Sequence, residues 1–245
     1  MSNTAIIIWK SVGVSLVALL LIAAVVCGVM MKPSEAPCRS LTYIIEDRED
    51  RLYLTENELN QLLTDEALYP VGKSVSSLSL HRIESTIRRH PMVRTAECYL
   101  TPRMEVKIRL TQRIPLLRVQ TPGETYFIDT DRRVMPVRTY VKDSVLVVTG
   151  AVGVQMASGA VAEFAEWLQD SRYWQPRVHH VYVQNPRMVY VYLKGQPRAV
   201  LGTMAEYESK LNKLRVFLEK GQEAIEDKHY TEYDLRFKGQ VIGRY

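Results

Sequence analysis

Acidic, histidine and cysteine side chains are the groups in this sequence whose spacing could support chemistry. Asp129 and Asp131 stand two residues apart and could hold a divalent cation through two carboxylates. They fall between two strand-like segments, however, and Asp is common in turns, so we interpret the pair as part of a turn. His179 and His180 are adjacent, and adjacent residues of a strand point to opposite faces, which argues against joint metal ligation. We predict no metal site.

Motifs that mark a nucleophilic or phosphate-binding site do not occur in the sequence. It contains no Gly-x-Ser-x-Gly, no Ser-x-x-Lys, no glycine-rich phosphate loop and no His-Glu-x-x-His. The three cysteines, Cys27, Cys38 and Cys98, form no Cys-x-x-Cys pair, although a bridge between Cys38 and Cys98 stays open. We therefore predict that the protein is not an enzyme and has no catalytic residues, no cofactor and no small-molecule substrate.

The composition is that of a protein with a packed core. Of the 245 residues, 47% are hydrophobic and 24% are charged, which is too apolar for a disordered chain. The net charge of +5 is too small to argue for a nucleic-acid partner. Basic residues nevertheless crowd the segment from 82 to 118. We interpret this segment as a solvated face; attraction to anionic lipid or to an acidic partner is the alternative.

An apolar run near the N-terminus predicts a transmembrane helix. Val12–Met31 contains twenty consecutive residues without a charge, and at about 1.5 Å per residue such a helix crosses a hydrocarbon core of about 30 Å. A cleaved signal peptide has a shorter apolar region, of roughly 7 to 15 residues, and a small-x-small cleavage site. We therefore predict a short tail at 1–11, an uncleaved membrane anchor at 12–31 and a polar, proline-bearing stalk at 32–40.

Residues 41–111 have the periodicities of a small unit with the order strand, helix, helix, strand, strand. Thr55 and Glu58 form a capping box that predicts the start of the first helix, and Ser79 and Pro91 bound the second helix. A hairpin follows, in which apolar and charged residues alternate along the second strand. The predicted strands are Leu41–Ile45, Val93–Leu100 and Met104–Leu110.

Residues 112–245 are predicted to form a mixed β domain with two helices. Ser158 is expected to cap the first of these helices, and Gly221 is expected to end the second. The predicted strands before the last segment of the chain are Ile114–Gln120, Thr125–Asp129, Val145–Thr149, Val178–Val183, Met188–Leu193 and Arg198–Gly202.

The last segment, Tyr233–Tyr245, alternates between two residue classes with a period of two. This pattern predicts one strand of thirteen residues, in which Gly239 marks a bulge or bend. A strand of this kind can lie at the edge of a sheet, where its unpaired backbone groups can template a partner strand. A central strand that closes the sheet is the alternative.

Several segments resemble one family when they are taken in order along the chain. They are His90–Glu97, Val106–Pro115, Tyr126–Asp129 and Tyr233–Phe237. Together with the N-terminal span, they are similar to the bacterial cell-division protein family FtsQ/DivIB. The resemblance implies an α+β fold: the N-terminal transmembrane helix, a polypeptide-transport-associated (POTRA) domain with the order β-α-α-β-β at 41–111, and the mixed β domain with two helices at 112–245. It also implies a single-pass protein of the cell inner membrane at the division septum, with a cytoplasmic N-terminus and periplasmic domains.

The resemblance further implies a non-enzymatic scaffold of the division machinery, the divisome, which links early and late division proteins. Its expected partners are small bitopic coiled-coil proteins such as FtsB and FtsL, one of which adds a strand at the edge of the sheet. The Asp-Leu-Arg-aromatic signature at 234–237 places this role on Phe237, Lys238, Gly239, Gln240 and Val241. Two rival hypotheses are a POTRA-type component of protein export or outer-membrane assembly, and an envelope enzyme that acts on cell-wall precursors.

Overall fold

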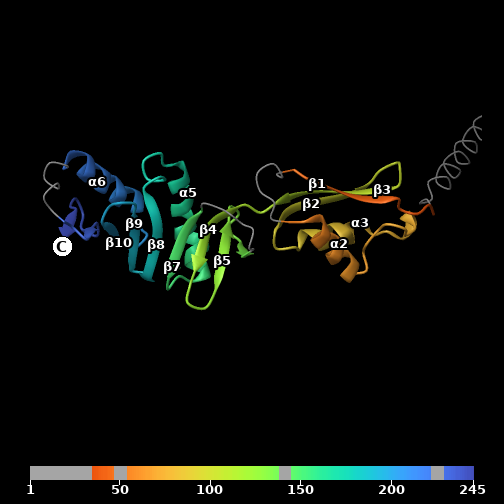
Figure 1. Ribbon diagram of the computed structural model, residues 1–245, viewed down its shortest axis with the longest axis horizontal. Coiled ribbons are helices and arrows are strands. Elements are labelled where there is room, and N and C mark those ends of the chain that lie inside the picture. Colours follow the sequence, from red (N-terminus) through yellow and green to blue (C-terminus); the bar gives the residue numbers. More distant parts are fainter. Residues whose placement is uncertain (1–34, 47–53, 138–144, 222–228) are drawn as a thin grey trace, which may run out of the picture.

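The computed structural model describes residues 35–46, 54–137, 145–221 and 229–245. The predicted anchor at 12–31 and the tail at 1–11 lie outside the described residues. In the part of the chain that is described, no helix combines the length and the apolar character needed to cross a membrane. Two lobes lie end to end in Figure 1, and each lobe is built on its own sheet.

The N-terminal lobe consists of a three-stranded sheet and two α-helices. Its elements are β1 (Ser40–Ile45), α2 (Glu56–Asp65), the 3₁₀ turn η1 (Val75–Ser77), α3 (Leu80–Arg88), β2 (Val93–Leu100) and β3 (Glu105–Gln112). The strand order is β1-β3-β2, in which β1 runs parallel and β2 antiparallel to β3. Both helices lie on one side of this sheet (Figure 1). The order strand, helix, helix, strand, strand is the one that the sequence predicts.

Local signals in the sequence explain the helices of this lobe. The Thr55 hydroxyl accepts a hydrogen bond from the backbone N–H of Glu58, and the Glu58 carboxylate accepts one from the backbone N–H of Thr55. The predicted capping box is therefore confirmed, and it satisfies two N–H groups that the helix leaves without partners. Leu59 and Leu63 of α2 pack with Ile83 of α3 in the core of this lobe.

The C-terminal lobe is a nine-stranded mixed sheet in the order β12-β11-β10-β9-β8-β7-β4-β5-β6. The strands are β4 (Pro115–Gln120), β5 (Thr125–Asp129), β6 (Val134–Pro136), β7 (Leu146–Gly150), β8 (Val178–Asn185), β9 (Met188–Leu193), β10 (Arg198–Gly202), β11 (Glu232–Asp234) and β12 (Ile242–Arg244). Three neighbouring pairs, β4 with β7, β7 with β8, and β10 with β11, are parallel, and the others are antiparallel.

The helical segments of this lobe pack with the sheet into one core. They are α4 (Val154–Met156), the π-helical segment η2 (Ala157–Val161), α5 (Ala162–Asp170) and α6 (Tyr207–Lys220). Phe164 of α5 contacts Tyr207 of α6 edge to face, with 5.2 Å between the ring centroids. The prediction that Ser158 caps the first helix is wrong, because the helical segment begins earlier, after Gly153. The Ser158 hydroxyl instead donates to the carbonyl of Val154, four residues before it.

The two adjacent histidines do not point to opposite faces of their strand. The pairing of β8 with β9 is irregular between Val178 and His180, and this irregularity breaks the alternation of side chains. The Nδ1 atoms of His179 and His180 lie 2.9 Å apart, so the prediction of opposed rings is wrong. Within the described residues, no group of three or more potential ligands is placed to hold a metal ion. Cys38 and Cys98 are both free thiols.

The last segment of the chain is not one strand of thirteen residues. It forms two short strands, β11 and β12, which pair antiparallel with each other and are joined by a loop. Gly239 in this loop has φ +72°, a left-handed conformation that turns the chain back. The regular alternation therefore predicts a single strand where the chain makes a hairpin.

The two lobes share buried contacts where they meet. Phe127 of β5 and Met135 of β6 belong to the C-terminal sheet, but their side chains pack into the core of the N-terminal lobe. At the same place the Arg113 guanidinium lies 2.6 Å from the Asp129 carboxylate, and both side chains are buried. The lobes are therefore joined by an apolar contact and a buried ion pair.

Asp129 ends β5 and Asp131 lies in the turn that leads to β6, which confirms the interpretation of the pair as part of a turn. The backbone N–H of Asp129 donates to the carbonyl of Arg133, and the Asp129 carboxylate accepts from the backbone N–H of Arg133 at 2.6 Å. The Asp131 carboxylate accepts two hydrogen bonds from Arg94 of β2, at 2.7 and 2.8 Å. Both carboxylates are thus used in contacts that position the turn against the N-terminal lobe.

Candidate functional site

The five residues predicted to bind a partner lie together in the loop between β11 and β12. Phe237 is 46% exposed, which is unusual for a phenylalanine, and Lys238, Gly239 and Gln240 are exposed beside it. Val241 is partly buried and packs against the core of the lobe. The structure brings these residues into one place at the end of the sheet, although none of them belongs to a strand.

Three hydrogen bonds from neighbouring elements hold the start of the loop in its conformation. The Lys213 ammonium, from α6, donates to the backbone carbonyls of Leu235 and Phe237. The backbone N–H of Leu235 donates to the carbonyl of Val200 on β10 at 2.9 Å, and the Leu235 side chain is buried. The start of the loop is therefore anchored, and the exposed Phe237 stands where the anchored part ends.

The strand β12 ends the order of strands in the C-terminal sheet. Its inner side pairs with β11, in the register Glu232 with Arg244 and Asp234 with Ile242. No other strand in the described part of the chain pairs with its outer side. An edge strand of this kind presents backbone N–H and C=O groups that can pair with a strand from another chain.

Gly243 allows a close approach between β12 and an aromatic cluster. A Cβ atom at this position would lie 2.4 Å from a ring carbon of Tyr230, a distance that no relaxed structure contains. Tyr230 also contacts Tyr233 and Tyr245, with ring centroids 6.0 and 5.2 Å apart. The glycine therefore lets the edge strand lie against Tyr230, and Tyr245 next to it is 77% exposed.

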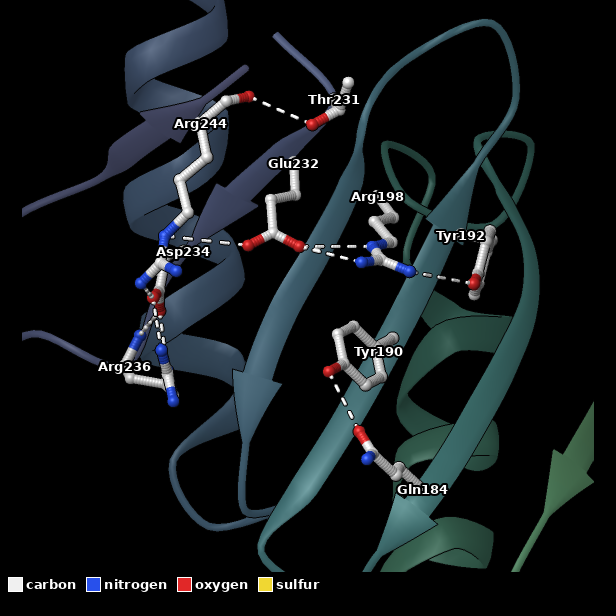
Figure 2. A network of polar contacts seen from close by, with 9 residues as sticks. All are labelled: Gln184, Tyr190, Tyr192, Arg198, Thr231, Glu232, Asp234, Arg236 and Arg244. Carbon is white, nitrogen blue, oxygen red and sulfur yellow. Dashed lines mark hydrogen bonds and ion pairs between the residues drawn. The ribbon is translucent and has the colours of Figure 1, made fainter.

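Asp234 is the centre of the polar network that ties the hairpin together (Figure 2). Its carboxylate is fully buried, and it accepts hydrogen bonds from the Arg236 guanidinium at 2.6 and 2.9 Å and from the Arg244 guanidinium at 2.7 Å. The backbone N–H of Arg236 donates to the same carboxylate at 3.1 Å. One residue of β11 thus holds both the start of the loop and the edge strand β12.

Electrostatics keep Asp234 ionised in this environment. Burial by itself would raise the pKa of the carboxyl, because a low dielectric disfavours the charged form. The hydrogen bonds from Arg236 and the charges of Arg236 and Arg244 outweigh this effect and hold the pKa of Asp234 below its usual range. The network therefore depends on a charged carboxylate at neutral pH.

A second acidic residue extends the network across the sheet. Glu232 accepts hydrogen bonds from the Arg198 guanidinium at 3.0 and 3.2 Å, and its other carboxylate oxygen lies 3.6 Å from Arg244. Arg198 in turn donates to the hydroxyl of Tyr192, and its guanidinium lies 4.7 Å from the centre of the Tyr190 ring. Figure 2 shows this line of side chains from β12 to β9.

The fold and the site define an α+β protein with two lobes, whose C-terminal sheet ends in a strand that pairs with β11 on its inner side and with no strand of the described residues on its outer side. Residues 36–111 match the family model of a POTRA-like domain. Residues 114–244, more than half of the chain, match the family model described as FtsQ/DivIB, C-terminal related. The chain therefore belongs to the FtsQ/DivIB family, a family of non-catalytic scaffolds of cell division. No curated protein matches the chain.

Sequence reasoning placed Phe237–Val241 in a strand, where the structure has a loop, and it did not identify the residues that hold the edge strand. The long-strand interpretation gives Asp234 no role beyond its place in an alternating pattern, whereas the structure buries it between Arg236 and Arg244. One signal was present: two arginines follow the aspartate within a segment that otherwise contains only one further charge, at Lys238. Tyr245 and the three residues of β12 were not among the predicted site residues.

Proposed function

We propose that this protein is a single-pass membrane scaffold of the divisome, and that β12 receives a strand from a small bitopic coiled-coil protein of the FtsB/FtsL type. The observation that carries the proposal is the outer side of β12, which no strand of the described residues covers. In this role the protein links early and late division proteins without acting as an enzyme. Membership of the FtsQ/DivIB family supports the divisome as the setting.

Strand addition would use two kinds of contact at this edge. Backbone hydrogen bonds to β12 would supply affinity, and side chains that stand beside the edge would supply specificity. Phe237 in the loop and Tyr245 after β12 are both exposed aromatic residues, and they flank the three-residue strand. Aromatic residues are enriched among the side chains that dominate binding energy at interfaces. We therefore extend the proposed site from Phe237–Val241 to include β12 and Tyr245.

The proposed membrane topology and domain boundaries start from those that the sequence predicts. Residues 1–11 are a cytoplasmic tail and 12–31 span the inner membrane. The predicted stalk at 32–40 is shorter than the sequence indicates, because Cys38 is buried in the N-terminal lobe and Ser40 begins β1. The POTRA domain at 41–111 and the β domain at 112–245 are periplasmic. The two domains do not have fully separate cores, because Phe127 and Met135 from the second domain complete the core of the first.

In-cell photo-crosslinking tests the proposal. A photoreactive residue at Phe237, Gln240 or Tyr245 should capture a small single-span coiled-coil protein, identified by mass spectrometry. The same residue at Val216, which is 43% exposed on α6, serves as the control and should not capture that protein. Capture of export components at the three positions would favour the export hypothesis, and capture of nothing by a folded protein would contradict strand addition at β12.

A further inference from the structure

A pocket of about 550 Å³ lies where the two lobes meet, at the opposite end of the C-terminal sheet from β12. Its lining residues are Ser85, Arg88, Arg89, His90, Pro91, Arg113, Arg133 and Val134. They come from the end of α3 and the turn after it, from the connection between β3 and β4, and from the turn before β6 together with the first residue of β6. The volume is within the range of about 300 to 1,000 Å³ that small-molecule sites occupy.

Four of the eight lining residues are arginines, and none is acidic. Two of these arginines are already compensated: Arg88 pairs with Glu84, and Arg113 pairs with the buried Asp129. Arg89 donates to the hydroxyl of Thr86 at 3.2 Å, and no ion pair is formed by Arg89 or Arg133 within the described residues. Two exposed guanidinium groups, from different lobes, therefore face this pocket without a carboxylate partner among those residues.

We propose that this pocket binds a small phosphate-bearing molecule. Two uncompensated guanidinium groups match the double negative charge of a phosphate group, and the planar fork of arginine suits its oxygens. Pro91 and Val134 add apolar surface for the part of the ligand that carries no charge. A pocket of this size accommodates a compact molecule, whereas strand addition by a partner uses an open sheet edge such as β12.

Binding at this place would couple the two lobes, because Arg89 belongs to the N-terminal lobe and Arg133 to the C-terminal lobe. A ligand that contacts both arginines stabilises the folded junction by mass action. The proposal does not rest on the scaffold function, and it uses none of the residues proposed to bind the partner strand.

Isothermal titration calorimetry tests the proposal with the full chain in phosphate-free maltoside micelles. Pyrophosphate is titrated at an ionic strength held constant with NaCl, and saturable binding with one molecule per chain is expected. Arg89→Gln and Arg133→Gln should each weaken binding about tenfold, as expected when one charge-assisted contact is lost. Arg132→Gln is the matched control: it removes the same charge from the same turn, but Arg132 pairs with Glu163 and Glu166 on α5.

Two further measurements distinguish the source of the phosphate group. Flotation with phosphatidylglycerol vesicles, compared with phosphatidylcholine vesicles, reports binding to an anionic lipid headgroup. Loss of this vesicle binding in Arg89→Gln and Arg133→Gln, but not in Arg132→Gln, would support the phosphate site. Absence of both pyrophosphate and vesicle binding would overturn the proposal, as would equal loss in Arg132→Gln. Tighter binding of a tetraglutamate peptide than of pyrophosphate would overturn it in favour of an acidic protein segment. Thermal unfolding of each variant checks that the fold is retained.

Discussion

Asp234 is the polar residue at the centre of the hydrogen bonds that hold the terminal hairpin together. Its carboxylate, with no exposed surface, accepts hydrogen bonds from two guanidinium groups and one backbone N–H. A buried carboxylate of this kind fixes the conformation of the hairpin but adds little net stability, because the cost of removing it from water offsets much of its attraction to the two arginines. Removal of one partner is nevertheless costly, because the remaining charges lose their counter-charge.

Asp234→Asn should lower the free energy of unfolding by about 2 kcal/mol. Breaking a fully buried pair costs about 3–5 kcal/mol, but Arg236 and Arg244 are partly exposed and can be hydrated after the change. Urea unfolding of the full chain at neutral pH measures the effect. Glu219→Gln, which removes an exposed ion pair with Arg215, should have a much smaller effect, because solvent screens an exposed pair. Equal costs for the two variants would contradict a special role for Asp234.

The lowered pKa of Asp234 also predicts how stability depends on acidity. A carboxyl whose pKa is lower in the folded than in the unfolded state contributes stability that is complete above the unfolded pKa, about 3.9 for Asp. This contribution is lost as the pH falls through the folded pKa. Between pH 6 and about pH 3, the wild-type protein should therefore lose more stability than Asp234→Asn. Parallel curves of unfolding free energy against pH for the two proteins would argue against the charged network.

At the scale of elements, the hairpin of β11 and β12 depends on two glycines for two different reasons. Gly239 is required by its left-handed φ of +72°, although a side chain there would meet nothing within 4 Å. Gly243 has an ordinary φ but no space, since Tyr230 lies against it. Gly239 therefore sets the backbone conformation of the loop, and Gly243 sets how closely the edge strand approaches Tyr230.

Gly239→Ala should destabilise the hairpin by about 1 kcal/mol, the cost of placing a side chain in the left-handed region, and Gly239→Asn should cost less. Gly123→Ala is the matched control, because Gly123 also has free space around it but does not have a positive φ. Hydrogen exchange of the amides in β11 and β12, followed by mass spectrometry, measures the change. An equal effect of Gly123→Ala on these amides would show that the conformation of Gly239 is not the cause.

At the scale of the whole molecule, the junction makes the lobes depend on each other. Phe127 is 3% exposed and belongs by sequence to the C-terminal sheet, yet it completes the core of the N-terminal lobe. The buried pair of Arg113 and Asp129 closes the same contact. The folding of each lobe should therefore depend on the other.

Phe127→Ala should lower the free energy of unfolding by about 3–5 kcal/mol and separate the unfolding of the two lobes. Differential scanning calorimetry should then show two transitions, in place of the single one expected for the wild-type protein. Phe164→Ala, in the core of the C-terminal lobe alone, should cost as much but leave exchange in β1 to β3 unchanged. One unchanged cooperative transition in Phe127→Ala would contradict coupling through the junction.

Patterns between near neighbours in the sequence were enough for much of the architecture. The capping box at Thr55, the alternation along β3 and the turn at Asp129 each depend on residues within a few positions of one another. Such features can be predicted from the sequence without knowledge of the fold. The same local character explains the error at the end of the chain. Alternation with a period of two describes a single strand and two strands joined by a loop almost equally well, and the left-handed Gly239 is one feature that separates them.

Contacts between distant residues needed the tertiary structure. The pairing of β11 with β10 and the bond from Lys213 to the loop join segments more than twenty residues apart. The meeting of Arg89 with Arg133 in one pocket joins residues of two lobes. Which strand forms the edge of a sheet, and which charges stay uncompensated, depend on every other strand and charge in the folded chain. The alternation at the end of the chain allowed either an edge strand or a central strand, and only the packed molecule decided for an edge and brought the arginines of the pocket together.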